Sequence, residues 1–172
     1  MDKDGRFEPE EGETDPFNSE DDPYIPPPVA FFDYSSEKPW VNETVTFNAS
    51  ASYSEKGSIT SYEWNFDDGN KTLTLELTIN HVYNNPGKYN VTLKVADNNT
   101  LWNTTTKTIT VYHRTDLNKD GAVNIVDLSI AAIAYQTKPE YPKWNATADI
   151  NKDEIINILD LSIIAKDYGK TI

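Results

Sequence analysis

The sequence predicts a multi-domain chain in which an antiparallel β-sandwich precedes a small all-α unit of two loop–helix repeats. Short runs in the middle of the chain alternate apolar and polar residues, and two similar 20-residue stretches recur near the C-terminus. Alternation with a period of two is typical of half-buried strands, whereas an internal repeat usually means two copies of one supersecondary unit. The expected segments are residues 1–28, 29–113 and 114–172.

Composition already excludes several classes of function. The chain has 172 residues with 28 acidic and 15 basic side chains, a formal net charge of −13, and no cysteine. This charge argues against nucleic acid and anionic membrane surfaces as partners, because both require basic patches. Without cysteine there are no disulfides, thiolate nucleophiles or cysteine-ligated zinc. No run approaches the roughly 20 apolar residues of a membrane helix, so membrane insertion is not expected.

Residues 1–28 predict an acidic, proline-rich linker. They hold ten acids and two bases, end in three prolines, and contain few apolar residues to bury. Their stretch DKDGRFEPEEGETDPFNSEDD resembles the acidic calcium repeats of bacterial surface proteins, so a calcium-repeat remnant is an alternative to a solvated spacer. Met1 leads into acidic residues rather than a signal peptide, which favours a start codon placed on a fragment of a longer protein.

Residues 29–113 have the length and the strand pattern of one antiparallel sandwich. Turn-forming residues at Gly57, 68–69, 86–87 and 98–99 separate the alternating runs. The side chains expected to point inward are Val45, Phe47 and Ala49; Tyr62, Trp64 and Phe66; Tyr89, Val91, Leu93 and Val95; and Ile109 and Val111.

The segments SITSYEWNFDDGN and HVYNNPGKYNVTLKVAD resemble a PKD domain, an Ig-like β-sandwich. The matching residues are Trp64, Phe66, Asp68, Gly69, His81, Tyr83, Pro86, Gly87 and Tyr89. The resemblance implies a spacer, or a module that contacts protein or polysaccharide. For Trp40 and Trp102 we expect burial in the sandwich core, with stacking on sugar as the alternative. We expect a structural hydrogen bond from His81, and we leave open a calcium site at Asp67 and Asp68.

The duplicated units, DLNKDGAVNIVDLSIAAIAY and DINKDEIINILDLSIIAKDY, start 33 residues apart and match at 12 of 20 positions. Oxygen-bearing side chains fall at loop positions 1, 3, 5, 9 and 12, which suits calcium, a cation that takes about six to eight oxygen ligands including a carbonyl from position 7. The predicted ligands are Asp116, Asn118, Asp120, Ala122, Asn124 and Asp127, and then Asp149, Asn151, Asp153, Ile155, Asn157 and Asp160. The alternative is an Asx-rich turn that binds nothing and caps a helix.

This repeat is similar to a type I dockerin, over residues 114–172. The resemblance implies two calcium-binding loop–helix (F-hand) units in antiparallel array that dock onto a cohesin domain. Partner contacts in the family come from loop positions 10 and 11 and from the helix that follows. They correspond here to Ile125, Val126, Ala132, Ile133, Ile158, Leu159, Ala165 and Lys166. Cellulosomal members often carry hydroxyl residues at the first pair, so the apolar residues favour a non-cellulosomal partner. The alternative is that both faces of these helices are core.

Three further features of the sequence complete the prediction. Glu154 stands where the first copy has Gly121, so the second calcium site is expected to be weaker if this turn needs a positive φ. The helices are expected over residues 128–135 and 161–168, from position 12 of each loop. Seven Asn-x-Ser/Thr triplets favour a secreted or cell-surface protein, archaeal or bacterial.

We therefore predict a non-catalytic, calcium-dependent module that binds a cohesin domain, with the sandwich as spacer or contact module of a larger exported protein. One alternative is a calcium-rigidified adhesin or surface-layer fragment in which the sandwich binds protein or polysaccharide. A glycosidase using paired carboxylates is a further alternative. It is disfavoured because loops and linker account for nearly all the acids.

Overall fold

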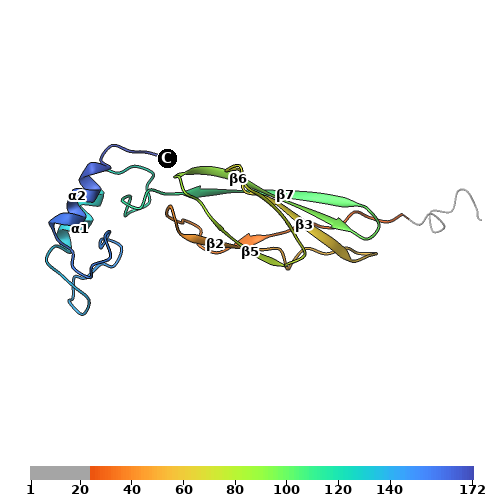
Figure 1. The fold of residues 1–172 in the computed structure, drawn as a ribbon, viewed down its shortest axis with the longest axis horizontal. Helices are drawn as coiled ribbons and strands as arrows, with labels where there is room; N and C mark the ends of the chain where they lie inside the picture. The colour runs from red at the N-terminus through yellow and green to blue at the C-terminus, as the bar shows by residue number, and fades with distance from the viewer. Residues whose placement is uncertain (1–23) are drawn as a thin grey trace, which may run out of the picture.

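The computed structural model describes residues 24–172. The proposed remnant of a calcium repeat lies outside these residues. The strands run along the long axis of an elongated body, and both helices lie at one end of it (Figure 1). The predicted combination of a β-sandwich and a small two-helix unit is thus confirmed.

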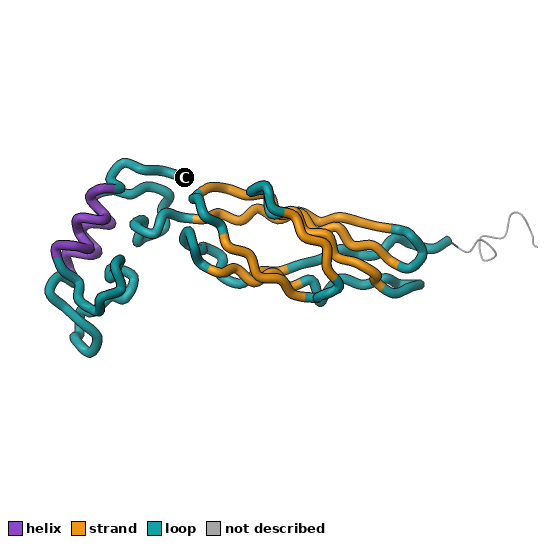
Figure 2. Tube along the Cα trace, in the orientation of Figure 1, coloured by secondary structure: helices purple, strands orange, loops and turns teal. Residues whose placement is uncertain are grey.

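The sandwich consists of two antiparallel sheets. The first sheet has the order β1-β2-β5 and the second β4-β3-β6-β7. The strands are β1 (Asp33–Tyr34), β2 (Thr44–Asn48), β3 (Ile59–Asn65), β4 (Lys71–Thr74), β5 (Thr78–Val82), β6 (Gly87–Asp97) and β7 (Trp102–Val111). β6 and β7 are the longest strands and pair over most of their length. β7 ends at the end of the sandwich nearest the helices (Figure 2).

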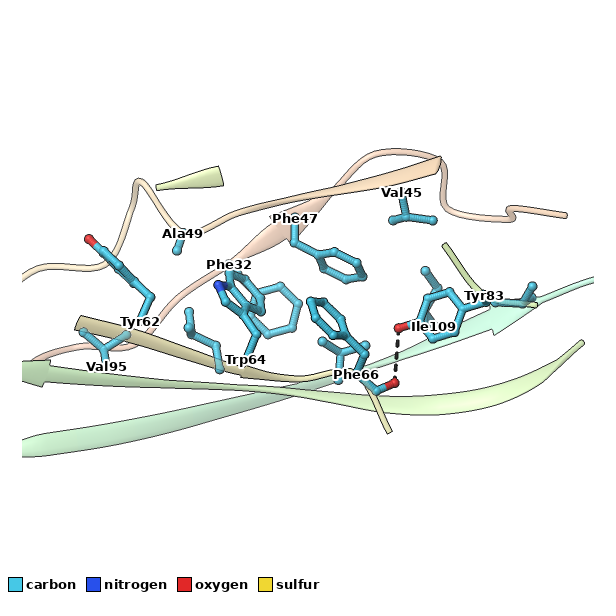
Figure 3. Packing of buried hydrophobic residues seen from close by; sticks show 13 residues of the cluster. Phe32, Val45, Phe47, Ala49, Tyr62, Trp64, Phe66, Tyr83, Val95 and Ile109 are labelled. Atoms are coloured by element: carbon cyan, nitrogen blue, oxygen red, sulfur yellow. Dashed lines mark hydrogen bonds between the residues drawn. The ribbon is translucent and has the colours of Figure 1, made fainter. Parts of the chain in front are cut away.

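The inward faces of the two sheets meet in an aromatic core. Trp64 is fully buried and packs edge-on against Phe32 at a centroid distance of 5.2 Å. Its ring is tilted against that of Phe47 at a centroid distance of 5.6 Å. Tyr83 closes the core near one end, where its hydroxyl donates to the carbonyl of Phe66 (Figure 3). All the inward positions predicted from the alternation are buried except Tyr89, which is partly exposed at the edge of the core.

The two helices begin and end earlier than expected. Helix α1 spans Ile125–Ile133 and α2 spans Ile158–Lys166, so each starts at loop position 10 rather than at position 12. The reason is local: Asn124 and Asn157 at position 9 act as N-caps, with an extended backbone and a side-chain oxygen that accepts a helix N–H. Neither helix of residues 24–172 is long and apolar enough to cross a membrane.

Each repeat forms backbone hydrogen bonds with the segment that follows the helix of the other repeat. Val123, buried in the first loop, bonds to the segment that follows α2, at Gly169 and Lys170. Ile156, the matching residue 33 positions later, bonds in the same way to the segment that follows α1. Each loop is therefore completed by the chain that leaves the other repeat, and the two repeats form one unit.

Candidate functional site

The first carboxylate of each loop is buried and holds the turn. Asp116 is 1% exposed and Asp149 is 6% exposed. The two carboxylate oxygens of Asp116 accept hydrogen bonds from the backbone N–H groups of Asp120 (3.2 Å) and Gly121 (2.9 Å). The second loop repeats this pair of bonds at Asp149 with distances of 3.2 and 3.0 Å. Since the pattern is duplicated, it is a property of the loop sequence.

The last carboxylate of each loop joins the loop to the start of its helix. Asp127 is fully buried, and its two oxygens accept from the backbone N–H groups of Leu117 and Asn124, each at 2.8 Å. Asp160 makes the corresponding bonds at 2.9 Å. The carboxylate thereby forms a capping box with the N-cap residue and lies in the first turn, where the helix dipole favours a negative charge.

The remaining predicted ligands lie in the loops but are engaged with one another. Asn118 donates through Nδ2 to Asp120 at 2.8 Å, and the second loop has the same bond at 2.9 Å. Asn124 caps α1 through Oδ1, while its Nδ2 donates to the carbonyl of Ala122 at 3.2 Å. The second loop matches this at Asn157 and Ile155. The position 9 amide oxygens are thus committed to the helix caps.

Three carboxylates of the second loop converge closely enough to share one cation. One oxygen each from Asp149, Asp153 and Asp160 lies within 4.8 Å of the others. The matching carboxylates of the first loop do not converge within that distance, and the second loop is the sole such group among residues 24–172. Because these donors are carboxylate, amide and carbonyl oxygens, they fit Ca²⁺, which prefers hard oxygen ligands, better than a softer metal.

Burial makes the first loop electrostatically costly without a cation. Desolvation raises the pKa of the Asp116 carboxyl, although hydrogen bonds from Gly121 and Asp120 oppose it, and the nearby charges of Asp127 and Asp120 add to the rise. In contrast, the hydrogen bond from Asn118 and other bonds lower the pKa of exposed Asp120. A cation in the loop would offset the cost of keeping Asp116 ionised.

The two loops differ at position 6, although their backbones do not. Gly121 has φ of 99° and Glu154 has φ of 65°, so both lie in the left-handed region. A non-glycine residue there costs about 1–2 kcal/mol. Lys119 and Lys152, at position 4 of each loop, share this conformation with φ of 56° and 60°. The prediction of a weaker second calcium site required a positive φ at Glu154, and this φ is present.

Every predicted partner-contact residue is exposed. Ile125 and Val126 in α1 are 61% and 46% exposed, and Ile158 and Leu159 in α2 are 63% and 56% exposed. Ile133 is 68% exposed, and Ala132, Ala165 and Lys166 are also exposed. The interior of the unit instead contains other helix residues, including Ala131 of α1 and Ile164 of α2. Within residues 24–172, nothing covers this apolar surface.

The sandwich contributes polar groups that are occupied by structural bonds. His81 Nε2 lies 2.8 Å from Asp68 Oδ2, and the His81 ring stacks on Phe66 at 3.9 Å. Asp67 accepts a hydrogen bond from the backbone N–H of Asn90 at 2.8 Å. The expected structural hydrogen bond of His81 is present, and both aspartates anchor the turn that contains the PKD-like motif.

The core interpretation of Trp40 and Trp102 is wrong. Trp102 is 58% exposed on the outer face of β7, with Lys94 over its ring at 4.9 Å. Trp40 packs against the first loop instead, and its indole Nε1 donates to the carbonyl of Asp116 at 3.1 Å. No spacing in the sequence links Trp40 to a loop 76 residues away, because a single aromatic residue before a strand has no periodicity to interpret.

Comparison with known proteins assigns the two halves separately. The PKD domain family matches residues 26–111, and the dockerin type I domain family matches residues 114–167. Collagenase ColA of Clostridium perfringens is 44% identical over 71 residues, which is 41% of this chain and 6% of the collagenase. A microbial collagenase of Vibrio alginolyticus is 34% identical over 77 residues, which is 45% of this chain and 9% of the collagenase.

Among solved structures, one of carbohydrate-binding modules from the β-sandwich superfamily, with promiscuous specificity, is 40% identical with a TM-score of 0.53. The match covers 58% of this chain and 40% of that chain. The chain thus spans a small part of the collagenases and less than half of this structure. Type I dockerins bind calcium, and the cluster of Asp149, Asp153 and Asp160 in the second loop could hold such an ion. The chain belongs to the PKD domain family, with a type I dockerin domain following the PKD domain.

Proposed function

We propose that the chain is a non-catalytic docking module that binds a cohesin domain in a calcium-dependent way, with the sandwich as its spacer. The observation that carries this proposal is the exposed apolar surface of α1 and α2 directly beyond two loops of buried carboxylates. Such a surface favours a protein partner, because contiguous exposed apolar patches are uncommon on monomeric proteins. The dockerin family match supports a cohesin as that partner.

Two Ca²⁺ ions would be held, one in each loop, by the predicted oxygen ligands other than Asn124 and Asn157, whose amide oxygens cap the helices. When bound, calcium supplies positive charge that offsets the burial of four aspartates, Asp116, Asp127, Asp149 and Asp160. Asp127 and Asp160 also orient the first turn of each helix through the capping box. The exposed residues at positions 10 and 11 directly follow the N-caps, so an ordered loop sets the positions of these contacts.

The decisive experiment is a pull-down from secreted and surface fractions of the source organism, with calcium or with a chelator. The matched variant carries Asp116→Ala and Asp149→Ala together. We expect recovery of a cohesin-domain protein by the unaltered chain with calcium only, and loss of helical circular dichroism in the variant. Recovery that is indifferent to both calcium and the variant would contradict the proposal.

A second candidate function is the alternative adhesin, in which calcium makes the dockerin unit rigid and the sandwich binds a polymer. The exposed ring of Trp102 favours it, since an accessible aromatic face can stack on sugar. The likeness to carbohydrate-binding modules supports polysaccharide as the ligand, and the collagenase relatives make collagen the matched comparison. Sedimentation with insoluble polysaccharide and with collagen, using Trp102→Ala, tests this function. Equal binding by the variant would contradict it.

We also propose that the protein is secreted or displayed at the cell surface. The asparagines of the six sandwich triplets, Asn42, Asn48, Asn70, Asn90, Asn98 and Asn103, are all exposed. A glycosylating enzyme could therefore reach each of these asparagines without unfolding of the sandwich. Mass spectrometry of the natural protein would show glycans on some of these sites. Recovery of the protein solely from the cytosol would contradict this localisation.

A further inference from the structure

Hydrogen bonds and a cation–π contact join the sandwich to the first calcium loop, and among residues 24–172 no such bond joins it to the second loop. The loop between β1 and β2 is paired to the chain that leaves β7, through the backbone bonds of Val41 N to Tyr112 O and Tyr112 N to Pro39 O, each 2.9 Å. This pairing places Trp40 at the junction, next to the residues that enter the dockerin unit. The position of the indole is therefore set by the sandwich backbone.

Trp40 contacts the first loop at two residues, Asp116 and Lys119, and also contacts Arg114 just before the loop. Its Nε1 donates to the carbonyl of Asp116 at 3.1 Å. The ammonium of Lys119 lies 3.4 Å from the ring centroid, and the guanidinium of Arg114 lies 4.8 Å from it. Lys119 also donates to the carbonyl of Lys38 in the sandwich. The two cations contact the ring by cation–π interactions, which leaves Trp40 poorly placed to stack on a sugar.

These contacts reach the ligand positions of the loop through its backbone. Asp116 is loop position 1, and Lys119 lies between positions 3 and 5 with a left-handed backbone. Burial lowers the pKa of Lys119, as expected for an ammonium partly withdrawn from water. Because Lys119 is held by both the ring and a sandwich carbonyl, its neighbours Asn118 and Asp120 have less freedom before a cation binds.

The second loop meets the junction differently. Lys152 has the same loop position and nearly the same φ as Lys119, yet it lines an open cleft of about 560 Å³ together with Ile150, Arg114 and Trp40. No hydrogen bond or cation–π contact joins Lys152 to the sandwich among the residues described. The two loops have matched internal bonds, so the contact with the sandwich is a difference between them that lies outside the loops.

We propose that Trp40 is a positioning residue for the first calcium loop, so that the sandwich forms part of that site and calcium there fixes the orientation of the two domains. This inference rests on the proposed calcium binding. It predicts that the first site depends on a residue of the other domain, whereas the second site does not. The dockerin unit would then present its exposed helix face at a set angle to the sandwich when calcium is bound.

The test is a calorimetric calcium titration of the full chain with one site disabled at a time. In the Asp153→Ala background, which leaves the first site, Trp40→Ala should weaken calcium binding by about tenfold, the effect of losing one well-placed hydrogen bond and its cation–π partners. Trp40→Phe, which keeps a ring but removes the N–H donor, should recover part of this loss. In the Asp120→Ala background, which leaves the second site, Trp40→Ala should change affinity less than twofold.

Lys119→Met and Lys152→Met are the matched pair, because the two lysines share loop position and backbone conformation. We expect Lys119→Met to weaken the first site several-fold and Lys152→Met to leave the second unchanged. Small-angle scattering with calcium should show a fixed domain arrangement in the unaltered chain and a broadened one in Trp40→Ala. Equal effects on the two sites, or no effect on either, would overturn the inference. Failure of the unaltered chain to bind calcium would instead overturn the proposed function.

Discussion

The sandwich and the dockerin unit bury different materials. The sandwich encloses thirteen apolar or aromatic residues, among them Phe32, Phe47, Trp64 and Phe66. The dockerin unit encloses seven, three of them alanines, and also buries four aspartates. A buried carboxylate opposes folding unless hydrogen bonds or an opposite charge offset its desolvation. The sandwich interior is thus mainly apolar, whereas the interior of the dockerin unit holds four carboxylates whose desolvation a bound cation would offset.

The largest expected effect comes from removing an aromatic ring from the sandwich core. Phe47→Ala should lower the unfolding free energy of the sandwich by about 3–5 kcal/mol, because it leaves a cavity among Phe32, Trp64 and Phe66. Urea unfolding followed by tryptophan fluorescence measures this loss. The control is Leu73→Ala on β4, a residue 70% exposed, which should cost less than about 0.5 kcal/mol. Similar losses in the two variants would contradict an aromatic core as the source of stability.

Calcium removal should destabilise the dockerin unit and leave the stability of the sandwich nearly unchanged. At a hundredfold excess over its dissociation constant, each bound ion should stabilise the dockerin unit by about 2.7 kcal/mol. Differential scanning calorimetry with calcium or chelator should therefore move the transition of the dockerin unit far more than that of the sandwich. Magnesium at the same concentration is the control, because it demands near-ideal octahedral geometry and gives up its bound water reluctantly. If both transitions shifted equally, the contrast between the two domains would be lost.

Exchanging position 6 between the loops separates backbone strain from contact with the sandwich. Gly121→Glu should destabilise the first loop by about 1–2 kcal/mol, because its backbone is left-handed. A Cβ there would also lie 3.3 Å from the side chain of Ile172. Glu154→Gly relieves strain but adds chain entropy to the unfolded state, so its gain should be under about 1 kcal/mol. Calcium titration and thermal melting of the two variants measure both effects; a large gain from Glu154→Gly would mean that the strain is underestimated.

The smallest expected effect is the pH dependence that Asp68 gives to the stability of the sandwich. Burial alone would raise the pKa of Asp68, but hydrogen bonds from Asn70 and His81 outweigh it and the pKa is lowered. A carboxyl whose folded pKa is lowered stabilises the protein above its unfolded pKa, and this stability is lost as pH falls through the folded pKa. The sandwich should therefore lose about 1 kcal/mol below about pH 4. Asp68→Asn should remove this dependence in acid melts, and an unchanged pH profile in the variant would assign it to another group.

The order of the two domains, the inward faces of the strands and the register of the duplicated loops could all be predicted from the sequence. These features are local or periodic: Trp64 and Phe66 alternate with polar residues, and Asp116 recurs as Asp149 at a constant spacing. The start of each helix could not be predicted, because Asn124 and Asn157 could act as ligands or as caps, and their hydrogen bonds in the structure show that they are caps. Likewise, the contact between Trp40 and the first loop joins two segments far apart in the chain. These segments meet only in the folded protein, where β7 ends next to the loop that contains Trp40. Contacts of this kind leave no periodic trace in a sequence, because they are set by how domains pack and not by how a single element folds.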